Sequence, residues 1–204
     1  MKDRWSGIVE LGLAILSPPR CAACDASVGI GRAFCPVCAA TVLRSTSAGA
    51  AFVYGGAMAT AITRMKYGDR PELGRVLGAL LASTAALEAV DLIAPVPLHP
   101  TRLAERGFNQ SALLAKPLAD AVHARFAPRL LSRVRPTPRQ AALDRAERRA
   151  NVAGAFKVRA PVVGMSILVI DDVRTTGSTL EACERALFAA GAREVRTLVL
   201  AEAP

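Results

Sequence analysis

The stretch that decides the fold lies near the C-terminus and reads Ser166-Ile-Leu-Val-Ile-Asp171-Asp172-Val-Arg-Thr175-Thr176-Gly177-Ser178-Thr179. It begins as a continuous apolar run, which is typical of a strand buried on both faces of a sheet. Two adjacent acids end the run, and a loop rich in hydroxyl groups then leads into a helical pattern over residues 179–190. Open α/β sheets bind ligands beyond the carboxyl ends of their strands, so the acids and the loop lie where a site is expected.

The loop after the acids has the composition of a phosphate-binding turn. Gly177 permits close approach of the backbone, its Thr and Ser neighbours add hydroxyl donors, and the N-terminus of the following helix contributes partial positive charge. The two carboxylates would repel a naked phosphate, but they can accept hydrogen bonds from the cis-diol of a ribose. Strand termination and helix capping would explain one acid but not both. The stretch therefore predicts a site for a phosphate joined to a ribose.

Further strands and helices are expected on both sides of this stretch. The apolar runs and their breakers predict strands over 51–54, 91–96, 130–134, 166–170 and 195–200, and helices through 62–65, over 73–87, after an Asn109 cap and over 179–190. Strands that alternate with helices predict an α/β fold, a mostly parallel sheet with flanking helices. We expect two parts: residues 1–45, a helix and a small cysteine module, and residues 46–204, the main domain.

Four of the five cysteines form two pairs, which read Cys21-Ala-Ala-Cys24 and Cys35-Pro-Val-Cys38. Two such knuckles can point four thiolates at one ion, so we expect a zinc-ribbon-like module with a structural Zn²⁺. Redox pairs and disulfides are the alternatives, and the absence of a strand-to-helix junction or a secretion signal disfavours them. Cys183 lies within a helical pattern and is expected to be a buried apolar residue.

The net charge of +9 comes from one segment. Residues 101–160 hold 13 Lys and Arg against 4 Asp and Glu, whereas the rest of the chain holds 13 of each kind. A localised basic block attracts a nucleic-acid backbone or a phosphorylated small molecule, although a solvated Arg-rich surface is the plainer explanation. The apolar run at residues 8–16 is shorter than the roughly 20 residues of a membrane span, so we expect no span and a cytoplasmic protein.

The stretch at 167–179 resembles the phosphoribosyl-pyrophosphate motif of type I phosphoribosyltransferases: four apolar residues, two acids, a spacer and Thr-Thr-Gly-x-Thr. The resemblance implies that the acids contact the ribose hydroxyls and that Mg²⁺ bridges the diphosphate and the sugar. The implied catalytic residues are Asp171 and Asp172, and the implied phosphoribosyl-pyrophosphate ligands include Val173, Arg174, Thr175, Thr176, Gly177, Ser178 and Thr179. Purine-salvage members commonly carry an acid at the position of Thr175, so threonine there disfavours 6-oxopurine salvage.

The order of motifs along the chain is similar to that of the ComF/GntX family of competence-associated bacterial proteins. After the Cys₄ module come Met65-Lys66-Tyr67-Gly68-Asp69, Pro95-Val-Pro97-Leu98-His99-Pro100, Arg102-x-x-x-Arg106-Gly107-Phe108-Asn109-Gln110, Arg139-Gln140-x-x-Leu143 and Arg148-x-x-Asn151. This resemblance implies that the loop after Val96 binds pyrophosphate, with Arg102 and Arg106 neutralising its charge and Lys66 reaching the same site. It also implies a flexible hood over residues 135–151 and a role in DNA uptake.

Three functions remain open from the sequence. The first is a phosphoribosyl-pyrophosphate-binding protein of natural transformation, which as an enzyme would displace pyrophosphate at C1 of the ribose. The second is a single-stranded DNA-binding module with a vestigial or regulatory sugar-phosphate site, working with DNA-uptake proteins. Its expected nucleic-acid-binding residues are Arg139, Arg145, Arg148 and Arg149, although the low aromatic content disfavours base stacking. The third is a nucleobase salvage transferase.

Overall fold

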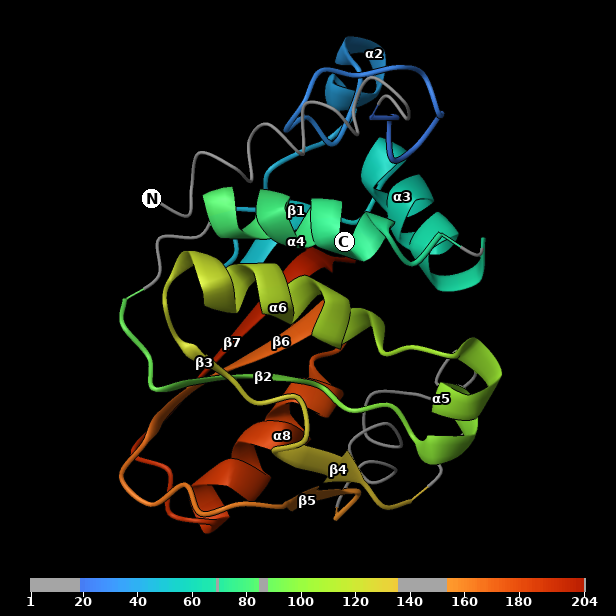
Figure 1. Ribbon diagram of the computed structural model, residues 1–204. Coiled ribbons are helices and arrows are strands. Elements are labelled where there is room, and N and C mark those ends of the chain that lie inside the picture. Colours follow the sequence, from blue (N-terminus) through green and yellow to red (C-terminus); the bar gives the residue numbers. More distant parts are fainter. Residues whose placement is uncertain (1–18, 69, 85–87, 136–153, 204) are drawn as a thin grey trace, which may run out of the picture.

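The computed structural model describes residues 19–68, 70–84, 88–135 and 154–203. Its elements in chain order are α2 (Pro36–Ala39), β1 (Ala50–Val53), α3 (Gly56–Tyr67), α4 (Leu73–Thr84), β2 (Leu92–Pro95), α5 (Pro100–Arg106), α6 (Gln110–Ala121), β3 (Arg125–Phe126), β4 (Leu131–Arg133), β5 (Phe156–Val158), β6 (Ser166–Arg174), α8 (Ser178–Ala189) and β7 (Glu194–Glu202). Figure 1 shows their arrangement.

Five of these strands form one sheet in the order β1-β7-β6-β2-β3, and every neighbouring pair is parallel. The strand that contains the two acids, β6, lies in the middle and pairs with β7 over most of its length. The predicted α/β fold with a mostly parallel sheet is therefore confirmed. A separate pair, β4 and β5, is antiparallel.

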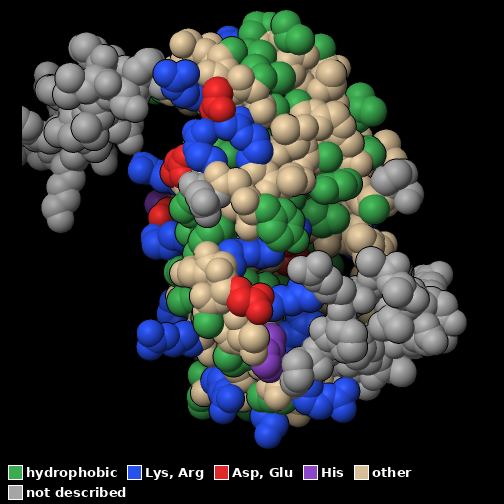
Figure 2. Space-filling model, turned by 90° about the vertical axis from the view of Figure 1, so that its right-hand side faces the viewer, with side chains coloured by type: hydrophobic (Ala, Val, Ile, Leu, Met, Phe, Trp, Pro, Cys, Tyr) green, Lys and Arg blue, Asp and Glu red, His purple; other side chains and the backbone are tan. Residues whose placement is uncertain are grey.

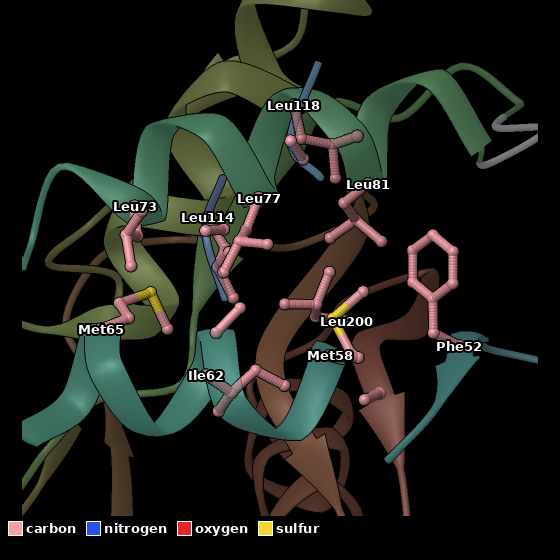
Figure 3. Packing of buried hydrophobic residues seen from close by; sticks show 14 of the residues in the cluster. Phe52, Met58, Ile62, Met65, Leu73, Leu77, Leu81, Leu114, Leu118 and Leu200 are labelled. Atoms are coloured by element: carbon pink, nitrogen blue, oxygen red, sulfur yellow. The ribbon is translucent and has the colours of Figure 1, made fainter. Parts of the chain in front are cut away.

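Helices cover both faces of the sheet, and β6 shows how the two faces divide (Figure 1). Leu168 and Ile170 join a buried cluster with side chains of α3, α4 and α6. Ile167 and Val169, which point the other way, join a second cluster with side chains of α8, β4 and β5. Successive side chains of a strand alternate between faces, so an unbroken apolar run gives a layer of helices on each side. Figure 3 shows the labelled Met and Ile side chains of α3 and the Leu side chains of α4 pointing toward one another, with Leu200 of β7 next to them.

Close packing of α4 on α6 fixes the position of α6. A Cβ atom added at Gly78 would lie 2.7 Å from the backbone oxygen of Leu114, which is far inside normal contact distance. Glycine at this position therefore lets the two helix backbones approach each other. The first turn of α6, which carries two side chains of the candidate site, is placed by this contact.

The elements differ from the sequence predictions mainly at their ends. The central strand β6 runs through both acids to Arg174, because Asp171 and Arg174 continue the ladder with β7. Helix α5 and the short strands β3 and β5 were not predicted from the sequence. Asn109 caps α6 as expected, since its side chain accepts a hydrogen bond from the backbone N–H of Ser111 at 3.0 Å. The predicted helix 73–87 ends at Thr84, and its last three residues lie outside the described ranges.

The cysteine module packs directly on α3. Cys21, Ala22, Phe34 and Cys35 belong to the same buried cluster as the helices α3, α4 and α6. The proposed boundary at residue 45 stays a prediction, because the module and the main domain share this cluster. The expected helix at residues 8–16 lies outside the described residues. Within the described ranges, no helix has the length and apolar content that crossing a membrane requires.

Candidate functional site

A crevice is expected where the chain leaves β2 and β6 in opposite directions. From β2 the chain passes through α6 to β3 at one edge, whereas from β6 it passes through α8 to β7 on the other side. The two helices cover opposite faces, so the loops at the carboxyl ends of β2 and β6 diverge. Such a switch point is the usual ligand site of open α/β sheets. The predicted site residues of β6 lie at this point.

Both acids at the end of β6 already contact side chains from other elements. The Asp172 carboxylate forms an ion pair with Nζ of Lys66 at the end of α3, and its Oδ1 accepts a hydrogen bond from Nε2 of Gln110 at 3.2 Å. Oδ1 of Asp171 accepts a hydrogen bond from Oγ of Ser111 at 2.7 Å. Helix α3 therefore supplies a cation, and the first turn of α6 supplies two donors. Asp172 is buried, with 4% of its surface exposed.

The negative charge of this cluster exceeds its positive charge. Burial, and after it the neighbouring Asp172, raise the pKa of Asp171 to about 7, although the hydrogen bond from the Ser111 hydroxyl opposes the rise. Burial would lower the pKa of Lys66, but the contact with Asp172 leaves that pKa raised, so Lys66 stays charged. Two carboxyl groups thus share one ammonium group. A divalent cation, or hydroxyl groups that donate to the acids, would relieve the excess.

The raised pKa of Asp171 predicts a pH dependence of stability. A carboxyl group whose pKa is raised on folding stabilises the fold below its unfolded pKa, and this contribution is lost as the pH rises towards 7. Asn at this position keeps the oxygen that accepts from Ser111 but cannot ionise. We expect Asp171→Asn to gain on the order of 3 kcal/mol relative to wild type between pH 4.5 and 8, since each pKa unit corresponds to about 1.4 kcal/mol. Urea unfolding across this range measures it, and a constant difference would contradict the assignment.

The loop between β6 and α8 encloses a small hollow of about 50 Å³, lined by residues 171 and 173–180. Gly177 has φ +78°, a conformation that favours glycine, and it is the residue before the first turn of α8. Among the described residues, the backbone N–H groups of residues 175–179 have no protein acceptor. The hydroxyls of Thr176 and Ser178 lie 3.0 Å apart beside them. Free amides at a helix N-terminus, with hydroxyls nearby, form an anion-binding site.

Arg174 anchors the start of this loop rather than filling it. Its guanidinium group donates to the backbone oxygen of Ala48 at 3.0 Å and to Glu202 at 2.8 Å. Glu202 also accepts a hydrogen bond from Ser45. The loop is therefore tied to the segment that joins the cysteine module to β1.

The arginines predicted at the pyrophosphate loop lie on α5, directly after β2. Nη1 of Arg106 donates to Oε1 of Gln110 at 2.6 Å, and the guanidinium group lies 5.1 Å from the ring centre of Tyr67. Burial lowers the pKa of Arg133 on β4, and repulsion from Arg102 lowers it further, so these two cations lie near each other. Figure 2 faces this end of the sheet and shows Lys and Arg side chains along it.

Three polar residues near the two acids of β6 were not predicted from the sequence. Gln110 and Ser111 lie in the first turn of α6, and Arg133 lies at the end of β4. Gln110 is the last residue of the motif that contains Arg102 and Arg106. Its position directly after the expected helix cap Asn109 was the signal that could have identified it. Arg139, Arg145, Arg148 and Arg149, together with most of the expected hood, lie outside the described residues.

Another hollow, of about 900 Å³, lies between α4, α6 and β3. Its lining includes Pro71, Leu113 and Phe126, and it holds charges of both signs. Lys116 at its rim is paired with Asp120 on the same helix. None of the predicted site residues lines it. Apart from Asp172, the predicted site residues of β6 and its loop line the small hollow at the switch point and not this larger one.

The four cysteines of the N-terminal module come together in one cluster. Their Sγ atoms all lie within 4.8 Å of one another, and those of Cys24 and Cys35 are 3.7 Å apart. A tetrahedral zinc ion with Zn–S bonds of about 2.3 Å would separate its sulfur ligands by about 3.8 Å, so the cluster could hold this metal. Burial opposes ionisation of Cys21, yet backbone N–H groups of Cys24, Cys35 and Ala23 lower its pKa to about 6. The fifth thiol, Cys183, is fully buried in α8, as expected.

An arginine of α3 joins the cysteine module to the helix that supplies Lys66. Nη1 of Arg64 donates to the backbone oxygens of Ala22 and Ala23 at 3.2 and 2.9 Å, and Nη2 contacts Asp25. Arg70 also pairs with Asp25, at 2.9 Å. These contacts fix the end of α3 against the first cysteine knuckle. The cysteine cluster and the two acids of β6 are therefore joined through one helix.

Comparisons with known proteins show which proteins this chain is similar to. The family model of the phosphoribosyl transferase domain matches residues 110–204, which run from the first turn of α6 to the C-terminus. The chain is 34% identical over 154 residues to the DNA utilization protein YhgH of Escherichia coli, covering 72% of this chain and 68% of that protein. It is 31% identical to competence protein F of Haemophilus influenzae, covering 70% of this chain and 66% of that protein.

Two further matches extend the comparison. Competence protein ComFC of Streptococcus pneumoniae is 29% identical over 195 residues, and the match covers 88% of this chain and 86% of that protein. Among solved structures, the glutamine phosphoribosylpyrophosphate amidotransferase of B. subtilis aligns with a TM-score of 0.47 and 23% identity. That alignment covers 67% of this chain and 30% of the solved chain.

Proposed function

The chain belongs to the ComF family of phosphoribosyltransferase-like proteins, which includes these competence-related relatives, and from this premise we propose that it binds phosphoribosyl pyrophosphate with Mg²⁺ at the switch point. The observation that carries the proposal is the loop of free amides at residues 175–179, which follows one partly buried and one buried carboxyl group. Phosphoribosyl pyrophosphate likewise carries a ribose diol and a 5-phosphate on one sugar. The acids would bind the diol, and the loop that follows them would bind the phosphate. We further propose that the protein acts in DNA uptake.

The 5-phosphate would bind in the hollow before α8. Residues 175–179 line a space of about 50 Å³, several times the volume that one water molecule needs. The hydroxyls of Thr175, Thr176, Ser178 and Thr179 add donors, and Val173 and Arg174 fix the start of the loop. The positive end of the α8 dipole favours a dianion there.

The ribose and the metal would bind at the acids. Burial destabilises the ionised form of Asp171. Hydrogen bonds from the sugar hydroxyls, or a bound cation, would compensate for this. Mg²⁺ in such sites takes one or two carboxylates, and the remaining ligands are substrate oxygens and water. When bound, the ion would neutralise charge on the diphosphate. Lys66 holds Asp172 in place through their ion pair.

The diphosphate would lie at the α5 side of the crevice. We propose that Arg102 and Arg106 bind it, since a guanidinium group has five donors and Arg106 uses Nη1 for Gln110. If the protein turns over, pyrophosphate leaves C1 as the bond to the acceptor forms. The arginines would then stabilise the charge of the leaving group. A nucleobase as acceptor remains an alternative proposal, and Thr175 disfavours a 6-oxopurine.

Two matched glycine variants test the phosphate site. Gly177 and Gly191 flank α8 and have φ +78° and +90°, so alanine at either position is strained by about 1 to 2 kcal/mol. We expect Gly177→Ala to lower the affinity for phosphoribosyl pyrophosphate by about tenfold or more, because the amides rearrange. Gly191→Ala, at the opposite end of α8, should lower stability without changing affinity.

Isothermal titration with phosphoribosyl pyrophosphate and Mg²⁺, together with a melting curve for each variant, makes the comparison. Wild-type protein that binds no ligand would refute the proposed function. Equal affinity of the two variants and wild type would refute the assignment of the loop.

Direct binding of single-stranded DNA is a second proposal, and it rests on the basic block at residues 101–160. A block of this charge would bind a strand mainly through its phosphates and would lose affinity steeply with salt. Its central residues Arg139, Arg145, Arg148 and Arg149 remain candidates from the sequence alone. The block shares Arg102 and Arg106 with the switch point, and both proposals can hold together.

A further inference from the structure

An exposed aromatic ring lies next to the acidic site. Tyr67 is the last residue of α3 and is 72% exposed, which is unusual for a ring beside a buried ion pair. The guanidinium group of Arg106, from the end of α5, lies 5.1 Å from the ring centre. Tyr67 directly follows Lys66, whose ammonium group contacts Asp172. The ring and the guanidinium group thus form a stacked pair, the Tyr67–Arg106 platform, at the rim of the site.

The platform is held by the same hydrogen bonds as the acids. Arg106 donates to Oε1 of Gln110 at 2.6 Å, and Nε2 of Gln110 donates to Asp172 at 3.2 Å. One continuous set of contacts therefore runs from the exposed ring to the buried carboxylate. The orientation of the guanidinium plane is fixed by a specific acceptor and not only by the ring below it.

Packing of the protein core does not explain this arrangement. A ring that is 72% exposed contributes little apolar burial to the fold, and an exposed cation–π pair adds only a small stabilisation. Stacked aromatic and guanidinium groups are, however, the surfaces on which unpaired bases stack. The nearby cations Lys66 and Arg106 suit a ligand whose base is attached to phosphate.

We propose that the Tyr67–Arg106 platform is a binding site for a nucleobase that is carried by a sugar phosphate. The base comes either from a mononucleotide, whose ribose 5-phosphate lies in the site proposed above, or from an unpaired base of a single strand. The first source rests on the proposed function, and the second does not. In either case Tyr67 contributes a ring face, and Arg106 contributes a planar cation held by Gln110.

The test compares three ligands on the full chain: adenosine 5′-monophosphate, ribose 5-phosphate and an oligodeoxyadenylate. Tyr67→Ala removes the ring, and Tyr67→Trp keeps an aromatic face. Phe188→Ala is the matched control, because Phe188 is a half-exposed ring at the far end of α8 from the phosphate loop. Affinities come from isothermal titration, and melting curves check that each variant is folded.

We expect Tyr67→Ala to weaken binding of a base-bearing ligand by about fivefold to a hundredfold, while Tyr67→Trp and Phe188→Ala stay within twofold of wild type. Ribose 5-phosphate should bind all four proteins equally. A loss confined to the mononucleotide or to the oligonucleotide identifies the source of the base. The inference is overturned if Tyr67→Ala binds both base-bearing ligands as wild type does, or if wild type binds neither. Failure of ribose 5-phosphate alone to bind wild type refutes the phosphate site and leaves the oligonucleotide result decisive for the platform.

Discussion

Removal of metal from the four-cysteine cluster is expected to lower the melting temperature by about 10 °C or more. Binding of zinc to a structural Cys₄ site contributes directly to folding free energy. In this chain the effect should extend beyond the module, because Cys21, Ala22, Phe34 and Cys35 belong to the cluster that α3, α4 and α6 bury. A loss of about 5 kcal/mol corresponds to about 10 to 20 °C for a domain of this size.

The measurement is a melting curve before and after incubation with a chelator, together with the zinc content by mass spectrometry. Cys38→Ser should lose zinc and melt early, because three thiolates leave the shell incomplete. Cys183→Ala is the matched control, since Cys183 is buried in α8 and lies outside the cluster, so it should keep one zinc ion per chain. Purified protein without zinc, melting as high as protein with zinc, would contradict the structural role.

Asp172→Asn is expected to cost about 3 kcal/mol of stability and to abolish detectable binding of phosphoribosyl pyrophosphate. Removing one partner of a buried ion pair leaves the other charge without compensation, which typically costs about 3 to 5 kcal/mol. Here the remaining charge would be Lys66, whose side chain is 19% exposed and still has Asp171 near it, so the lower end of that range applies. For a domain of this size, the loss is about 6 to 12 °C in melting temperature.

The double variant Lys66→Met/Asp172→Asn separates the two effects. It removes both charges, so we expect it to recover most of the stability while phosphoribosyl pyrophosphate binding stays lost. A double-mutant cycle from urea unfolding measures the coupling, and isothermal titration measures binding. Stability losses that simply add in the double variant would show that the pair is not coupled. Recovery of binding in the double variant would refute the role of Asp172.

The sequence by itself determined the parts of the protein that depend on near neighbours. The apolar run of β6 predicted a buried central strand, and the parallel sheet with helices on both faces followed from the alternation of elements. The two C-x-x-C pairs predicted a cysteine cluster, which the structure contains. The loop proposed to bind phosphate was recognisable for the same reason, since the acids, hydroxyls and Gly177 lie within a few consecutive residues. The strand β6, the cysteine pairs and the loop after the acids are each encoded within about twenty residues.

The tertiary structure alone decided how the site is assembled from distant segments. Lys66 reaches Asp172, Ser111 donates to Asp171, and Tyr67 lies under Arg106 only because α3, α5 and α6 converge on the ends of β2 and β6. No local pattern specifies which polar side chains will meet across sixty or a hundred residues of chain. Their meeting depends on how closely the helices pack, as the contact of Gly78 with α6 illustrates. Neighbouring residues in the sequence therefore determine which chemical groups the acids and the loop carry. Tertiary packing determines which distant side chains contact them.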